Sequence, residues 1–218
     1  MGFFNRMRVA SRAYWEKVKD RLQDTEMDDI CAELQALGID AQMAERGRPE
    51  EKIGGEDNRN LDEFCLRGIS LGLIDIPEGP IRWVNIRDEH SEHVNIYYTN
   101  YGVPDPRLGP ASPVMYIYSV RKKNFPLVGR VVDLHWKGRE WYFTPVRNQG
   151  LRIIDRLKSD ILIKHSLIKE SFDVKIYASR DYRCWIISTK TRSPLSEDLW
   201  DCYQAIARHL LAEWSPSK

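Results

Sequence analysis

The stretch WVNIRDEHSEHVNIYY, residues 83–98, decides the fold, because here the hydrophobic period of the chain changes to two. It contains Val-Asn-Ile twice, on either side of a charged centre. Two alternating segments around a polar centre predict a β-hairpin. Pairing residues whose numbers sum to 180 aligns the two triplets and leaves residues 88–92 as a five-residue loop.

This pairing gives the predicted hairpin two different faces, because successive side chains of a strand point to opposite sides. One face is apolar and consists of Val84, Ile86, Val94 and Ile96. The other combines aromatic rings with amides and consists of Trp83, Asn85, Asn95 and Tyr97. Aromatic anchors often dominate interfaces, so we expect this second face to bind a protein or peptide partner. The alternative is that another part of the chain covers it and Trp83 belongs to the core.

The charged centre of the hairpin raises the question of a metal site. His90, His93 and Glu89 are the candidate ligands, since two imidazoles and a carboxylate can converge on an ion. The segment EHSEH, however, has neither of the two spacings that helical zinc motifs use, and no distant ligand can be nominated. A solvated polar turn is the alternative.

Working outward toward the C-terminus, the alternation continues and is interrupted by helical patterns. Strands are predicted at 81–87, 93–99, 114–121, 130–136, 140–144, 173–178 and 183–189, and helices at 150–169 and 197–214. Ser196 is the expected N-cap of the last helix. The sequence therefore predicts an α+β fold with a mainly antiparallel, curved sheet of about seven strands and two helices in the C-terminal half.

Working outward toward the N-terminus, the pattern is helical. Residues 3–22 form a basic amphipathic helix, a second helix runs from Thr25 to Gly38, and a third begins at Asn60 and stops near Gly72. A polar, mobile loop is expected near 39–58. We therefore divide the chain into a helical N-terminal arm, residues 1–78, and a globular α+β domain, residues 79–218.

Charge is segregated along the chain, although the net charge is only +1. Residues 1–23 have six basic and two acidic side chains, residues 24–78 have five and 15, and residues 79–218 have 22 and 15. This pattern favours docking of an acidic segment on a basic body, within one chain or in a homodimer. We expect the apolar stripe of the helix at 3–22 to pack on the body or on a sister chain. Peripheral membrane contact and an organellar presequence are the alternatives.

Composition excludes several classes. The 218 residues are 42% hydrophobic and 30% charged, as in ordinary globular proteins, and contain no apolar run long enough for a transmembrane segment. We expect a cytoplasmic location and free thiols at Cys31, Cys65, Cys184 and Cys202. The chain lacks a G-x-S-x-G elbow and a phosphate-binding loop, and no cofactor is implied. We therefore favour a noncatalytic protein.

A basic and aromatic segment at 120–142 suggests a different function. Its cations can neutralise phosphates and its rings can stack on bases, which makes nucleic-acid binding the first alternative. The residues concerned are Arg121, Lys122, Lys123, Arg130, Lys137, Arg139 and Trp141, together with Trp136. A metal-dependent hydrolase or nuclease is the second alternative, with Asp173 and Lys175 beside Asp133 or Asp155.

Overall fold

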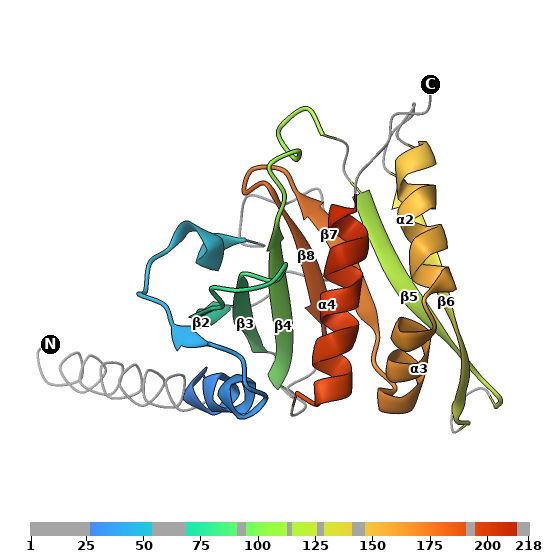
Figure 1. The fold of residues 1–218 in the computed structure, drawn as a ribbon, viewed down its shortest axis with the longest axis horizontal. Coiled ribbons are helices and arrows are strands. Elements are labelled where there is room, and N and C mark those ends of the chain that lie inside the picture. Colours follow the sequence, from blue (N-terminus) through green and yellow to red (C-terminus); the bar gives the residue numbers. More distant parts are fainter. Residues whose placement is uncertain are drawn as a thin grey trace, which may run out of the picture.

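One antiparallel sheet of eight strands, with helices on one of its faces, forms the body of the computed structural model (Figure 1). The structure describes residues 27–53, 69–90, 95–112, 115–125, 129–140, 147–190 and 195–212. The strand order is β1-β2-β3-β4-β8-β7-β5-β6, and the sheet is open. The predicted α+β class and antiparallel sheet are confirmed, with eight strands in place of about seven.

The strands are Gln42–Met43 (β1), Ile69–Asp75 (β2), Trp83–His90 (β3), Asn95–Pro104 (β4), Met115–Lys123 (β5), Val131–Glu140 (β6), Val174–Ser179 (β7) and Cys184–Thr189 (β8). The helices are the short 3-10 helix η1 (Pro49–Lys52), α2 (Arg147–Ser159), α3 (Ile161–Glu170) and α4 (Glu197–Leu211), and residues 27–36 form a further helix. In Figure 1, α4 lies over the middle strands, and α2 and α3 lie over β5 and β6.

The main core lies between the helices and one face of the sheet, because alternate strand residues point there. Its strand residues include Val84, Ile86, Tyr101, Ile117, Trp136, Ile176, Trp185 and Ile187, and α4 contributes Leu199, Tyr203, Ile206 and Leu210. The rings of Tyr101 and Tyr203 pack with centroids 4.5 Å apart. The stripe along α4 therefore fixes which face of the sheet is covered.

Strand β2 corrects the predicted third helix. Residues 69–75 are a strand, so the predicted N-terminal arm is not wholly helical, and β1 and β2 belong to the same sheet as the later strands. Leu71 and Leu73 are buried on opposite faces, which removes the polar alternation that marks a strand. Gly72 lies at a β-bulge and does not end a helix. The rest of that predicted helix lies outside the described residues.

The helix predicted at 150–169 is two helices, so the C-terminal half has three rather than two. Asp160 interrupts it with an extended conformation, and its side chain accepts a hydrogen bond from the backbone N–H of Ile163 at 3.2 Å. The last helix is confirmed: the Ser196 hydroxyl accepts from the backbone N–H of Leu199 at 3.3 Å. The second predicted helix is confirmed over residues 27–36, followed by Gly38 with φ of +77°.

The predicted amphipathic helix at 3–22 lies outside the described residues, as do most of the strand at 140–144 and Cys65. Cys31, Cys184 and Cys202 are free and buried. Among the helices that are described, none has the length and apolar character needed to cross a bilayer.

Candidate functional site on the open face of the sheet

The face of the sheet opposite α2, α3 and α4, named here the open face, has its own smaller hydrophobic cluster. It contains Ile53, Leu73, Trp83, Tyr177, Cys184 and Ile186. Ile53 comes from the segment of residues 48–53, named here the strap, whereas the others come from four strands. The strap therefore packs on one half of the open face.

The strap is bound to the sheet through its main-chain carbonyls. The amide nitrogen of Asn85 donates to the carbonyl of Glu50 at 3.3 Å. The guanidinium of Arg87 donates to the carbonyls of Glu51 and Ile53 at 3.0 and 3.1 Å. Two polar side chains of β3 thus bind the strap through its main-chain carbonyls, which every polypeptide has.

Both of these side chains are buried in the folded protein. Asn85 is 0% and Arg87 3% exposed. Desolvation lowers the pKa of Arg87, because burial opposes the charged form. The carbonyls of the strap supply acceptors for that buried cation, and the hydroxyl of Ser70 donates to the amide oxygen of Asn85 at 2.8 Å. Without the carbonyls of the strap, the buried donor groups of Asn85 and Arg87 that bind them would be unpaired.

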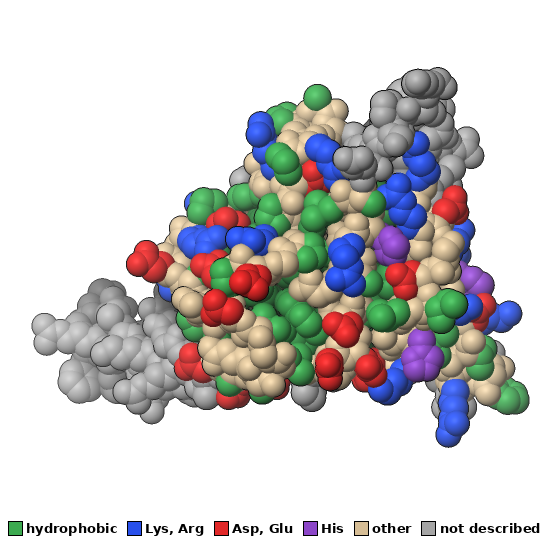
Figure 2. Space-filling view, in the orientation of Figure 1, with side chains coloured by type: hydrophobic (Ala, Val, Ile, Leu, Met, Phe, Trp, Pro, Cys, Tyr) green, Lys and Arg blue, Asp and Glu red, His purple; other side chains and the backbone are tan. Residues whose placement is uncertain are grey.

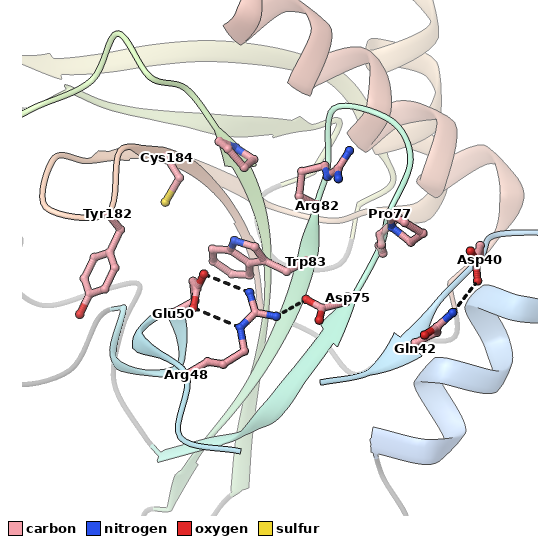
Figure 3. A pocket seen from close by; sticks show the side chains of 12 residues that line it. Asp40, Gln42, Arg48, Glu50, Asp75, Pro77, Arg82, Trp83, Tyr182 and Cys184 are labelled. Atoms are coloured by element: carbon pink, nitrogen blue, oxygen red, sulfur yellow. Dashed lines mark hydrogen bonds and ion pairs between the residues drawn. The ribbon is translucent and has the colours of Figure 1, made fainter. Parts of the chain in front are cut away.

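A pocket of about 580 Å³ lies beside the start of the strap (Figure 3). Arg48 spans it: the Nη2 and Nε atoms bind the carboxylate of Glu50 at 3.0 and 3.3 Å, and Nη1 binds Asp75. Burial would raise the pKa of Glu50, but the hydrogen bonds from Arg48 outweigh it and hold the pKa below its usual value. The Arg48–Asp75 pair joins the strap to the end of β2, and the Arg48–Glu50 pair lies within the strap.

Trp83 forms the inner wall of the pocket, with its indole lying flat over Gly102 of β4. A Cβ atom at Gly102 would overlap the ring, so the close packing requires glycine. Cys184 also lines the pocket, and desolvation raises the pKa of its thiol to about 12. A thiol that stays protonated at neutral pH is a poor nucleophile, so the pocket suits binding rather than thiol chemistry.

A continuous row of polar residues crosses the open face from the strap to the far side of the sheet. Paired positions place Asn85, Asn100, Ser188, Lys175, Tyr118 and Lys137 side by side on six successive strands. The first three are buried, Lys175 and Tyr118 are half-buried, and Lys137 is exposed. Exposure therefore increases along the row as it leaves the strap.

Lys175, Tyr118 and Lys137 at the end of the row lie beside Tyr116, which is two residues from Tyr118 on the same face of β5. We name these four residues the tyrosine–lysine surface. The rings of Tyr116 and Tyr118 are stacked, with centroids 5.5 Å apart and planes at 28°. Tyr118 lies between the two lysines across the strands. Apolar rings flanked by cations can contact a ligand that is both anionic and partly apolar.

The residues predicted for the partner site do not form one surface. β3 pairs with β4 in a register that places Trp83 opposite Gly102, so the paired numbers sum to 185 and the predicted sum of 180 is wrong. Because this sum differs from the predicted one by five, an odd number, Tyr97 lies on the face opposite Trp83 and packs against the main core. Trp83 is 4% exposed, Asn85 is under the strap, and the side chain of Asn95 is outside the described part.

The residues predicted for nucleic-acid binding take several positions. Lys122, Lys123, Arg130 and Lys137 are exposed, and basic side chains project around the tip of the β5–β6 hairpin (Figure 2). Arg121 pairs with Asp173 at 2.6 Å. Trp136 is buried under the helices and cannot stack on a base. The side chain of Arg139 and the whole of Trp141 lie outside what the structure describes.

The predicted metal ligands cannot be compared with the structure. His93 and the side chains of Glu89 and His90 lie outside the described residues. Within the described ranges, no three His, Cys, Asp or Glu side chains are grouped as metal ligands. Of the carboxylates considered for a hydrolase, Asp173 pairs with Arg121, and Asp133 pairs with Lys164 at 2.7 Å.

Sequence reasoning missed the strap and the two tyrosines of the tyrosine–lysine surface, although it had named Lys137 and Lys175 for other functions. The two tyrosines did have a signal, because they alternate with Met115 and Ile117 in a strand that was predicted. The strap had none: Arg87 and its acceptors are separated by 34 and 36 residues.

Comparison with known proteins finds no matching family model, no matching curated protein and no matching solved structure. The function therefore has to be inferred from the chain's own residues.

Proposed function

We propose that the protein is a noncatalytic interaction module that binds a polypeptide on the open face of its sheet, at the tyrosine–lysine surface. The observation that carries the proposal is the strap. One half of this face binds a segment of the chain itself, through the carbonyls of Glu50, Glu51 and Ile53 and through the apolar side chain of Ile53. The bound carbonyls of Glu50 and Glu51 belong to a 3-10 turn, but main-chain carbonyls and an apolar side chain are features of any polypeptide segment.

The other half of the same face, which no described segment of the chain covers and which we name the uncovered half, has the composition of an interface. Tyr116 and Tyr118 combine apolar area with hydroxyl groups and lose little conformational entropy on binding, since the rings already pack on each other. Lys137 and Lys175 add charge that steers an acidic partner. The proposal includes self-association as one form of partner binding, and a cytoplasmic location inferred from sequence alone.

A random peptide library displayed on phage tests this function. Panning against the intact chain should enrich peptides that bind, and Tyr118→Ala should weaken that binding about tenfold or more, as expected for an aromatic anchor. The matched control is Tyr182→Ala, a half-buried tyrosine that lines the pocket beside the strap. Peptides that bind Tyr118→Ala as well as the unaltered chain would contradict the proposal.

Nucleic-acid binding is the second candidate, and one observation favours it. Tyr118 is flanked by Lys137 and Lys175, and Lys122 and Lys123 are exposed at the end of the same strand. A ring between cations suits a base and its phosphates. In a gel shift, binding should then fall steeply with salt, and reversing Lys122 and Lys123 should weaken it for all base sequences. Absence of a shift at low salt would exclude this candidate.

A further inference from the structure

Strands β5 and β7 separate after Tyr118, toward the C-terminal end of β5, and a notch lies between them. Their pairing ends where Tyr118 faces Lys175, whereas β5 continues to Lys123. In place of the next ladder bond, the backbone N–H of Val174 donates to the hydroxyl of Ser119 at 2.8 Å. The result is a cavity of about 540 Å³ next to the tyrosine–lysine surface.

The notch is positively charged. Its lining contains Arg121, Lys123 and Lys175 against one carboxylate, Asp173, which gives a net charge of +2. Arg121 is fixed by Asp173 and by the carbonyl of Ser171. The side chain of Lys123 is exposed and makes no ion pair or hydrogen bond within the described residues. Fixed and unpaired cations together favour an anionic ligand.

The backbone distinguishes a polypeptide from other anions. Val120 to Lys123 pair with β6 on one side, but no described strand pairs with their other edge. An unpaired strand edge offers alternating N–H and C=O groups, which match an extended peptide and have no counterpart in a nucleic-acid backbone. The same edge lies beside Tyr118, which provides apolar area for the side chains of such a peptide.

We propose that the notch between β5 and β7 binds an acidic polypeptide segment in extended conformation, with its carboxylates on Lys123 and Lys175 and its main chain along the free edge of β5. This inference rests on the proposed function and specifies the chemistry of the partner. Arg121 positions the notch by holding β5 to the segment before β7, and the two lysines contact the ligand.

Fluorescence anisotropy with fluorescein-labelled decaglutamate tests the inference at about 50 mM salt, where exposed charges are weakly screened. Decaglutamate should bind, and Lys123→Glu and Lys175→Glu should each weaken binding about tenfold, because each change places a like charge next to the ligand. The matched control is Lys158→Glu, an equally large charge reversal on the exposed side of α2. It should change affinity less than about twofold.

Each other outcome contradicts the inference. No binding of decaglutamate, or an equal loss with Lys158→Glu, would mean that the notch does not select acidic peptides. Tighter binding of an oligothymidylate of the same length, with the same dependence on Lys123 and Lys175, would make the notch a nucleic-acid site. If the peptide library enriches neutral peptides that need Tyr118, the interaction function stands and only the acidic partner is wrong.

Discussion

The two halves of the open face differ in how their polar side chains find partners. On β3, Asn85 and Arg87 are buried, and the strap supplies the acceptors that their polar groups need. On β5 and β7, Tyr118 and Lys175 lie at the same level of the sheet and stay half-exposed. One half is closed by the chain itself, and the other offers rings, cations and a free strand edge to solvent.

This difference indicates which polar groups contribute to stability and which can bind a partner. A polar group under the strap contributes to stability, because removing it leaves a buried partner unpaired. A polar group on the uncovered half costs little to change, because water replaces its partner. Substitutions on the two halves should therefore separate effects on stability from effects on binding.

The largest expected effect is at Trp83, in the closed half. Trp83→Ala should lower the free energy of unfolding by about 3–5 kcal/mol, because it leaves a cavity over Gly102. Tyr118→Ala, in the uncovered half, should cost about 1 kcal/mol. Urea denaturation measures both. A loss for Trp83→Ala no larger than that for Tyr118→Ala would erase the distinction between the halves.

Arg87 tests whether the carbonyls of the strap hold it in place. Arg87→Met should cost about 2–4 kcal/mol, since the buried carbonyl of Ile53 and the part-buried carbonyl of Glu51 lose their donor, and hydrogen exchange of the strap should accelerate. Arg48→Met is the control. Its ion pairs are about one-third exposed and should contribute about 0–1 kcal/mol. Equal effects of the two substitutions would show that the strap depends on surface charge rather than on its backbone.

A smaller effect should appear with pH at Glu50. Its folded pKa lies below the usual value, so its ion pair with Arg48 stabilises the fold above the usual carboxyl range. That stability should be lost as the pH falls through the lowered pKa. The difference in unfolding free energy between the unaltered chain and Glu50→Gln should therefore shrink on acidification. A difference that is constant with pH would mean that this ion pair within the strap does not stabilise the fold.

Local patterns predicted most of the α+β body. The apolar arc and Ser196 cap of α4, and the alternation of β5, β7 and β8, are short-range signals that depend on a few neighbouring residues. The hairpin of β3 and β4 was predicted in the wrong register. The prediction aligned the two Val-Asn-Ile triplets, whereas the actual pairing extends beyond them to Gly102. Strand β2 lacked an alternating pattern because both of its faces are buried.

The candidate site was less predictable for a physical reason. Its polar row is formed by residues on six strands, and the strand order that aligns them follows from long-range pairing. Trp83 and Asn85 were correctly placed on one face of β3, but nothing near them in sequence indicates that residues 48–53 cover it. The basic residues of 121–123 were identified, whereas the notch beside them depends on where β7 begins.

The most direct test of the central claim is an NMR titration of the isotope-labelled chain with the peptide that the library enriches most. Binding at the uncovered half predicts that amide shifts concentrate in residues 115–123 and 174–179. The strap and α4 should change little, because the strap already occupies its half and α4 lies on the other face. Shifts confined to α2, α3 and α4, with β5 and β7 unchanged, would contradict the account.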